Sequence, residues 1–309
     1  MVSATINPRL RVLVAGGTGF IGRHAVDALL QRDTQVIIGS RKPGRVPTGR
    51  STTETREVRF EDLQSSAAWQ AIIRDCDVVL NCVGILRQVG SATYVRVHHR
   101  APHALAEACA AAGKRFIHVS ALGLHDQARS RFLTSKLAGE REIRHSGGDW
   151  LIVRPSLLDG EGGFGAWWLR QVSRLPLFVV PANAKGQIAA LKVEELGEAL
   201  AALCIDRAED LRLQESREFD LGGVEHFTLK DYIRRLRTRY TSRAAICVPI
   251  PGLLARLIAH VCDLLHFTPF SFGHYELLTR DNRPEINRLP ELLGRTPGLI
   301  CERTTVGSA

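Results

Sequence analysis

The sequence predicts an α/β protein with a doubly wound parallel sheet, and three observations lead to this fold class. Short apolar runs rich in Val, Leu and Ile recur through residues 1–155. Such runs are typical of strands that are buried on both faces. Segments of helical periodicity lie between the runs, and a glycine-rich stretch follows the first run directly. Strands that alternate with helices at this spacing form right-handed βαβ units in one sheet.

Six strands and three helices are expected in this part of the chain. The strands are residues 11–15, 35–39, 58–60, 78–83, 116–119 and 150–154. The helices are residues 21–31, 95–112 and 132–145. In the first helix Ile21, Ala25 and Leu29 share an apolar face. The third should end at Gly147 and Gly148, because glycine readily adopts the left-handed conformation that stops a helix.

The pattern changes after Pro155, which indicates a second, smaller unit. Residues 1–155, with returning segments near 187–223, should form the sheet domain. The returning segments include a helix at 193–205 and a late strand at 218–223. Residues 156–186 and 224–309 should form a smaller C-terminal lobe over the carboxyl ends of the strands, where ligands bind in this architecture.

Composition narrows the class of protein. The 309 residues include 41 Lys or Arg and 32 Asp or Glu, a formal charge of +9 that favours anionic partners such as phosphorylated cofactors or acidic lipid. Nucleic acid is not expected, because no aromatic-plus-basic pattern of a nucleic-acid module occurs. The seven cysteines form no CxxC pair, so we expect neither disulfides nor structural zinc. No apolar run is long enough to span a bilayer and no signal-peptide layout is present, so a cytoplasmic location is expected, with peripheral membrane association left open.

The strongest motif is VLVAGGTGFIG, in which Gly16, Gly19 and Gly22 follow a buried strand and open a helix. Glycine lets the backbone turn tightly and approach a pyrophosphate, while the helix N-terminus offers free N–H groups to the phosphates. The sequence therefore predicts a Rossmann domain that binds a dinucleotide. The residues of the turn expected to bind it are Gly16, Thr18, Gly19, Phe20, Ile21 and Gly22.

The end of the second strand favours NADP(H) over NAD(H). An NAD site usually has Asp or Glu at this point to bind the ribose 2′-hydroxyl. Here Arg41 and Lys42 follow the strand, and their cationic groups suit a 2′-phosphate. The alternative is that both belong to a solvated basic loop, since Arg45 and Arg50 follow.

The phrases GGTGFIG, LNCVG, FIHVSALG and IVRPSLLDG together resemble the short-chain dehydrogenase/reductase superfamily. The similarity is to its atypical branch, especially to proteins like the nucleotide-binding accessory subunit of respiratory complex I, and it covers most of the chain. By this resemblance Asp62 and Leu63 would line the adenine pocket. Asn81, Val83 and Gly84 would flank the adenosine half, and Pro155 and Ser156 would lie near the nicotinamide.

The chain departs from the family at the acid–base residues. Active members carry Tyr-x-x-x-Lys on the helix after the fifth strand and a serine just beyond that strand. Here the tyrosine position is Phe132, only Lys136 remains, and the serine position is Ala121, after Ser120. A phenyl ring cannot transfer a proton, so the family's usual mechanism lacks its acid–base group. The nearest upstream tyrosine, Tyr94, is on a different element.

Three functions remain open on this evidence. The chain could hold NADP(H) without turnover, in an accessory or assembly role near respiratory or quinone metabolism; this reading is slightly favoured. It could instead be an active NADPH-dependent reductase of a small apolar or quinone-like substrate. Lys136 would then be the catalytic residue and would also contact the cofactor. It could also be a nucleotide-sensing regulator that binds a protein partner.

Several further residues have both a chemical and a plain structural interpretation. His99, His103 and Glu107 share a helix face, but without a further ligand motif a metal site is not expected. His125, in the loop after the fifth strand, is the first candidate for a replacement acid, although an ordinary polar loop residue is the safer interpretation. The two tryptophans of the AWW sequence, residues 166–168, would stack on a substrate ring or simply pack over the cofactor.

An apolar stripe covers residues 252–265, and a helix rich in arginine precedes it. A stripe of this kind usually packs into a core or a subunit contact. The alternative is a docking surface for a membrane or a large complex, because basic residues lie beside it. We expect the stripe to pack within the C-terminal lobe and the arginines to form a solvated face.

Overall fold

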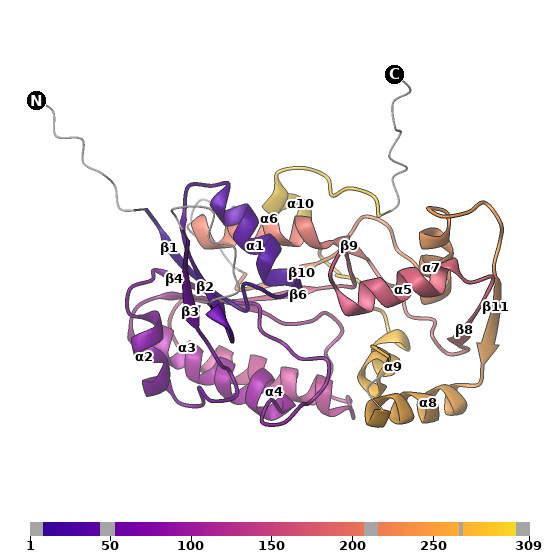
Figure 1. The fold of residues 1–309 in the computed structure, drawn as a ribbon, viewed down its shortest axis with the longest axis horizontal. Helices are drawn as coiled ribbons and strands as arrows, with labels where there is room; N and C mark the ends of the chain where they lie inside the picture. Colours follow the sequence, from indigo (N-terminus) through magenta and orange to yellow (C-terminus); the bar gives the residue numbers. More distant parts are fainter. Residues whose placement is uncertain (1–8, 44–52, 207–215, 266–267, 301–309) are drawn as a thin grey trace, which may run out of the picture.

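The computed structural model describes residues 9–43, 53–206, 216–265 and 268–300, and its centre is a seven-stranded parallel sheet (Figure 1). The strand order is β10-β6-β5-β4-β1-β2-β3. The strands are β1 (Arg11–Ala15), β2 (Gln35–Ser40), β3 (Thr53–Glu57), β4 (Val78–Asn81), β5 (Arg115–Val119), β6 (Trp150–Pro155) and β10 (Glu218–Leu221). All neighbours pair in parallel, so the predicted doubly wound fold is confirmed.

The position of the third strand was wrongly predicted. β3 ends at Glu57, and the expected segment 58–60 follows it, with Val58 and Phe60 buried and the Phe60 ring edge-on to Trp69. β3 lies at the edge of the sheet and has the polar sequence TETRE. An edge strand can be polar, because it is not buried on both faces. The apolar character of Val58 and Phe60 therefore belongs to the buried segment after the strand and not to the strand itself.

Helices cover both faces of the sheet (Figure 1). On one face lie α1 (Phe20–Leu30), α6 (Val193–Ile205) and α10 (Leu289–Leu293). On the other lie α2 (Ser66–Ile73), α3 (Ala101–Ala111) and α4 (Arg131–His145). A π-helical turn, η2 (Val95–Arg100), precedes α3, so the expected helix at 95–112 is present with a wider first turn. Two apolar clusters, one on each face, form the core.

The remaining elements gather to the right of the sheet in Figure 1. They are β7 (Leu158–Asp159), α5 (Phe164–Arg174), β8 (Leu177–Pro181), β9 (Leu191–Lys192), α7 (Leu229–Arg237), β11 (Ile246–Ile250), α8 (Gly252–Leu265) and α9 (Phe272–Leu278). β8 and β11 pair in parallel as a separate two-stranded sheet. Thr228 caps α7 by accepting a hydrogen bond from the N–H of Asp231. Across the described ranges, no helix has both the length and the apolar character that crossing a bilayer requires.

The predicted helix at 252–265 exists as α8, but its stripe does not pack into a core. The buried residues of α8 are the small ones: Ala255, Ala259 and Cys262. Its large apolar side chains are exposed: Leu253, Leu254, Leu257, Ile258, Val261, Leu264 and Leu265. The expectation of core packing is therefore wrong, because periodicity places the stripe on one side of the helix without showing which side meets the protein.

Candidate nucleotide-binding and catalytic site

The topology directs the site to the carboxyl ends of β1 and β4. The chain runs outward through β1, β2 and β3 and then returns to β4, on the opposite side of β1. In open parallel sheets such a reversal of direction leaves a crevice in which ligands bind. The predicted glycine turn follows β1 directly, so it lies at this crevice.

The glycines of the turn are required by close backbone contacts. Gly16 has a φ of 76°, and a Cβ atom there would lie 3.0 Å from the Val83 side chain after β4. A Cβ at Gly22 would lie 2.2 Å from the carbonyl oxygen of Gly16, which is too close for any side chain. The turn is closed by a hydrogen bond of 2.8 Å from the Gly19 N–H to the same oxygen.

Gly19 leaves the N-terminus of α1 open to an anion. It is the N-cap residue of α1, without a side-chain capping bond, and the first turn has no acidic residue. The first N–H groups of a helix have no intrahelical acceptor and carry the positive end of its dipole. The backbone N–H groups of Phe20 and Ile21 are therefore open to an anionic ligand, and phosphate binding by these residues stays a prediction.

The end of β2 lies beside this turn. The Thr18 and Ser40 hydroxyls are 3.4 Å apart, and the N–H of Lys42 donates to Ser40 Oγ at 3.2 Å. Arg41 and Lys42 are exposed, so their side chains can reach a ligand held at the turn. Arg45 and Arg50 lie outside the described residues.

The predicted adenosine contacts follow β3 and β4 at the same edge of the sheet. Asp62 is exposed, while Leu63 is half-buried and its carbonyl accepts a hydrogen bond of 3.1 Å from Trp69 Nε1. Asn81 is fully buried, and its Oδ1 accepts from the Val83 N–H at 2.9 Å. A Cβ at Gly84 would meet nothing nearer than 3.9 Å, so the backbone there is accessible.

Phe132 and Lys136 lie one turn apart on α4, which begins where Ser130 Oγ accepts from the N–H of Leu133. The Phe132 ring is buried among Tyr94, His98 and His274, with ring centres 5.5 to 5.8 Å away. Lys136 is also buried. Burial lowers the pKa of Lys136 to about 8, against the opposing effect of the Glu140 charge.

Tyr94 lies close to Phe132, which the resemblance assigns to the tyrosine position of the family. Its ring centre is 5.8 Å from that of Phe132. Its hydroxyl, however, donates to the carbonyl oxygen of Leu86 at 2.9 Å, and burial raises the pKa of the phenol. A hydroxyl held in this way, with a raised pKa, is poorly suited to give up a proton.

Sequence reasoning missed two buried histidines whose pKa values are lowered in part by the charge of Lys136. Burial is the main cause that lowers the pKa of both His98 and His118, to about 3 for His118, and the Lys136 charge adds to it. The Asn81 amide donates to His118 Nδ1 at 2.9 Å, which assigns the ring proton to Nε2. Within the described part of the chain, Nε2 is buried and has no hydrogen-bond partner. A histidine inside the apolar run FIHV was the signal for it.

A second polar atom without a partner lies at the end of β5. Ser120 is buried, and its Oγ bonds to none of the described residues. Ala121, the predicted serine position, comes next and is half-exposed. Buried polar atoms are rarely left unpaired, so Ser120 Oγ and His118 Nε2 are unusual among the described residues.

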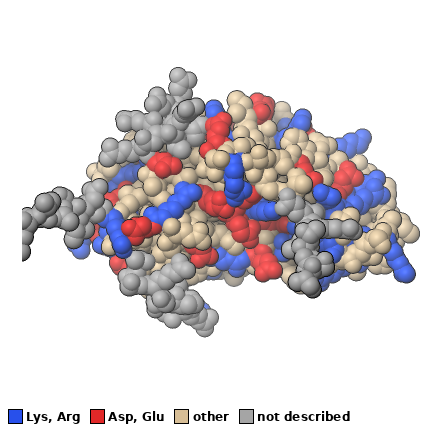
Figure 2. Space-filling model, turned by 90° about the horizontal axis from the view of Figure 1, so that it is seen from above, with Lys and Arg blue, Asp and Glu red and all other residues tan. Residues whose placement is uncertain are grey.

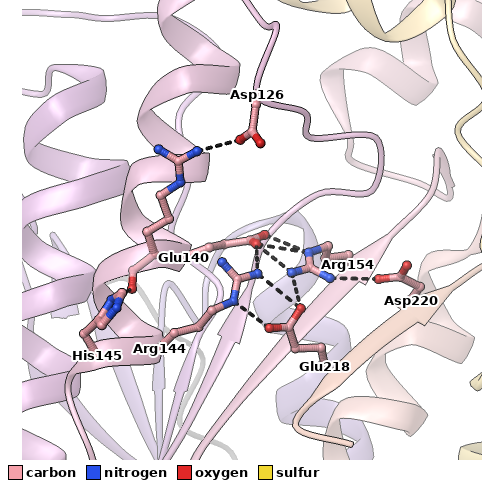
Figure 3. A network of polar contacts seen from close by, with 8 residues as sticks. Asp126, Glu140, Arg144, His145, Arg154, Glu218 and Asp220 are labelled. Carbon is pink, nitrogen blue, oxygen red and sulfur yellow. Dashed lines mark hydrogen bonds and ion pairs between the residues drawn. The ribbon is translucent and has the colours of Figure 1, made fainter.

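An ion-pair network ties α4 to β6 and β10 (Figure 3). Arg154 donates to Glu140 at 2.7 Å and to Glu218 at 2.5 Å, and it also pairs with Asp220. Arg144 joins the same two glutamates. Glu140 is fully buried one turn after Lys136, so the network fixes the helix that carries the lysine.

The resemblance also placed Pro155 and Ser156 near the nicotinamide. Pro155 ends β6, and its carbonyl accepts from the N–H of Leu122 at 3.1 Å. Ser156 Oγ donates to the carbonyl of Asn282 and accepts from the N–H of Ala189, so it has a structural role. His125 has two buried ring nitrogens without partners among the described residues, and burial lowers its pKa.

On the predicted helix face with His99, His103 and Glu107, the His103 side chain lies close to two carboxylates. His103 Nε2 lies 3.5 Å from Glu107 and 3.8 Å from Glu142. In the described ranges, no group of three or more His, Cys, Asp or Glu side chains is arranged to hold a metal ion.

Two cavities lie near the site. The first, which we call the Phe132 cavity, has a volume of about 330 Å³ and lies between the start of α4 and helices α8 and α9. Its lining includes Phe132, Tyr94, Arg87, Arg131, His260 and Asp263. The second, of about 480 Å³, is lined by Trp167 and Tyr240 with Arg170 and Arg174. Trp167 is half-exposed and stacks on Phe164.

Comparison with known proteins agrees with this geometry. Residues 16–167 match the model of an NAD(P)H-binding family. A ceramide reductase of Caulobacter vibrioides is 30% identical over 295 residues, which cover 94% of this chain and 90% of that protein. Subunit 9 of the NADH dehydrogenase [ubiquinone] 1 alpha subcomplex of Rattus norvegicus is 30% identical over 159 residues, or 48% of this chain and 40% of the subunit.

Solved structures show the same fold at low identity. A nucleoside-diphosphate-sugar epimerase of Staphylococcus aureus aligns with a TM-score of 0.73 and 15% identity, over 94% of this chain and 98% of the epimerase. An NADPH-dependent quinone oxidoreductase of Escherichia coli, solved with NADPH, aligns with a TM-score of 0.69 and 15% identity, over 93% and 96% of the two chains.

Proposed function

This chain belongs to the atypical branch of the NAD(P)H-binding short-chain dehydrogenase/reductase superfamily, and on that premise we propose that it is an NADPH-dependent reductase of an apolar carbonyl compound. The observation that carries the proposal is the burial of Lys136 beside the Phe132 ring. This burial lowers the pKa of Lys136 to about 8. An acid whose pKa is near the working pH transfers protons efficiently.

In the proposed reaction a carbonyl becomes an alcohol. NADPH, when bound, supplies the hydride to the carbonyl carbon and leaves as NADP⁺. The ammonium group of Lys136 donates the proton to the carbonyl oxygen and is recharged from solvent. Its positive charge also stabilises the negative charge that develops on that oxygen. Ser120 Oγ, which has no partner in the described chain, is available to orient the same oxygen.

The residues present fit the cofactor. The glycine turn would leave no room for side chains at Gly16 and Gly22, and the N-terminus of α1 is open to phosphate. Thr18, Gly19, Phe20 and Ile21 would complete the phosphate contacts. Asp62, Leu63, Asn81, Val83 and Gly84 would contact the adenosine half, and Lys136 and Pro155 the nicotinamide half.

A preference for NADP(H) over NAD(H) is part of the proposal. Arg41 and Lys42 are exposed at the end of β2, next to the phosphate turn, and no carboxylate takes the position of the usual 2′-hydroxyl ligand. Two cationic groups there would pair with a 2′-phosphate and would gain little from a hydroxyl.

The proposed substrate is an apolar ketone or quinone. The relative that matches over nearly its whole length is named as a ceramide reductase, whereas the chain spans about two-fifths of the rat complex I subunit. The proposed domain division is a Rossmann domain, 1–155 with segments near 187–223, and a C-terminal lobe. The proposed location is cytoplasmic.

A second candidate is an accessory protein that holds the nucleotide without turnover. It is favoured by Phe132, whose buried ring cannot donate a proton, and by the similarity to complex I subunits. A nucleotide-sensing regulator would use the same site. All three functions require binding of the nucleotide, but only the reductase consumes NADPH.

The test is NADPH oxidation with long-chain ketones, enones and quinones by wild type, Lys136→Met and Lys136→Arg. Arginine keeps the positive charge but does not release its proton. We expect both variants to lose turnover by at least about a hundredfold, while Lys136→Arg retains NADPH binding. No turnover of any substrate by a wild type that binds NADPH would instead favour the accessory role.

A further inference from the structure

Helix α8 turns its small residues toward the protein and its large apolar residues toward solvent, whereas a helix that packs on a protein usually buries its large apolar residues. Ala255, Ala259 and Cys262 face inward, and the seven large apolar side chains face outward. The exposed fractions of those seven lie between 39% and 81%. Contiguous exposed apolar surface of this kind marks a binding surface, because its contact with water is unfavourable.

The two-stranded sheet next to α8 continues this exposed apolar character. On β8, Phe178 and Val180 are buried, while the alternate residues Leu177 and Val179 are about half exposed. On β11 the exposed residues are Ile246, Val248 and Pro249. β11 leads directly into α8, and α8 also contacts β8. We call the outward residues of α8, β8 and β11 together the apolar end.

Basic residues accompany the apolar end. Segments 164–185 and 229–265 together contain ten Lys or Arg and two Asp or Glu. Arg174, Lys185, Arg243 and Arg256 are among the exposed ones. Figure 2 shows one face of the molecule, on which acidic side chains gather toward the middle and basic ones predominate at the right-hand end. Four of the ten add little exposed charge, because Arg170 and Arg239 pair with Asp159, Arg235 pairs with Glu225 and Arg237 is buried.

We propose that the apolar end docks on a bilayer that contains anionic lipid. An apolar helix face among cationic side chains lies in the interface of such a membrane, with the apolar face among the acyl chains and the cations at the headgroups. A second copy of the chain is a poorer occupant, because it would bring two surfaces of the same positive charge together. With 14 residues, α8 lies along the surface rather than across the bilayer.

Docking in this position places the Phe132 cavity at the membrane surface. His260 and Asp263 of α8 line this cavity, which extends to Phe132 on α4. An apolar molecule could therefore pass from the lipid to the cavity without crossing water. This surface would serve the proposed reductase, but its existence does not depend on that proposal.

Sedimentation of the full chain with vesicles tests the docking. Vesicles of phosphatidylcholine with phosphatidylglycerol should bind the chain, and those of phosphatidylcholine alone should bind it at least about tenfold more weakly. The triple variant Leu253→Gln/Leu257→Gln/Leu264→Gln should weaken binding to the anionic vesicles by at least about tenfold. The single variant Leu253→Gln should also bind more weakly. Its control is Ile286→Gln, an exposed apolar residue outside the apolar end, which should bind as wild type does.

The opposite results would overturn the proposal. They are no binding to either vesicle, equal binding to both, or a triple variant that binds as wild type does. A wild-type dimer that the triple variant converts to a monomer would assign the surface to a second copy. Binding is measured without nucleotide, and turnover with water-soluble ketones, so docking and catalysis can fail separately. An unchanged melting temperature confirms that the variants are folded.

Discussion

The Nζ atom of Lys136 lies 5.8 Å from the centre of the Phe132 ring, one turn away on α4. In the family that this chain resembles, a tyrosine takes the position of Phe132 and a lysine lies beside it. In the proposed reaction the lysine has no tyrosine to activate and donates its own proton. Burial lowers the pKa of Lys136 to about 8, and the charge of the nearby Glu140 opposes this shift.

Replacing Lys136 should change stability with pH. Its pKa is lowered from 10.5 to about 8, so between these values the unfolded chain holds a proton that the folded chain has released. The free energy of unfolding therefore rises with pH through this window. Lys136→Met should stabilise the fold by about 1–3 kcal/mol at pH 7, and the gain should disappear above pH 10.5. Urea unfolding at both pH values measures it, with Lys230→Met as the exposed control.

Replacing Arg41 should remove the preference for the phosphorylated cofactor. Arg41→Ala loses a charge-assisted contact to the 2′-phosphate, so the Kd for NADPH should rise by about tenfold or more. The Kd for NADH should stay the same, because its hydroxyl gains little from the guanidinium. Isothermal titration checks this, with Arg32→Ala at the far end of α1 as control. Equal affinities of the wild type for NADPH and NADH would contradict the assignment.

A methyl group at Gly22 should abolish nucleotide binding. Its Cβ would lie 2.2 Å from the Gly16 carbonyl oxygen, so the turn must open. Gly22→Ala should also lower the melting temperature, in keeping with about 1–3 kcal/mol for overpacking. Gly165→Ala is the matched control, because a Cβ there meets nothing within 4 Å. Thermal shift with and without NADPH measures both effects, and wild-type behaviour of Gly22→Ala would rule out a tight phosphate turn.

Removing the charge of Glu140 should affect both stability and Lys136. Glu140 is fully buried and bonds Arg154 and Arg144, so Glu140→Gln should cost about 3–5 kcal/mol. The Glu140 charge raises the pKa of Lys136, and its loss should lower the upper pH limit of turnover. Asp126→Asn, in the exposed pair with Arg141, should change neither quantity. An unchanged pH profile in Glu140→Gln would separate the network from the lysine.

The sequence predicted the parts of the site that depend on local contacts. The turn of Gly16, Gly19 and Gly22 is encoded within a few residues, and the structure places it at the switch between β1 and β4. The strands buried on both faces were found for the same reason. The edge strand β3 was missed because one side of it faces solvent and its sequence is polar.

Other features of the site depend on residues far apart in the chain. Tyr94 meets Phe132, and the Asn81 amide orients His118, through contacts across 38 and 37 positions of the sequence. The ion pairs of Glu140 with Arg154 and of Arg154 with Glu218 likewise join separate elements. A pattern of polar residues indicates neither these partners nor the loss of solvent that shifts the pKa of Lys136.

The amino-acid sequence by itself determined the parallel sheet and the glycine turn after β1, since each follows from residue type and spacing over a short stretch. The assignment of Phe132 to a tyrosine position rests on the resemblance to the family. Only the tertiary structure decided that Lys136 is buried, that Ser120 and His118 hold polar atoms without partners among the described residues, and that α8 turns its leucines outward. Helical periodicity shows that a face is apolar, but solvent exposure depends on which segments pack against it.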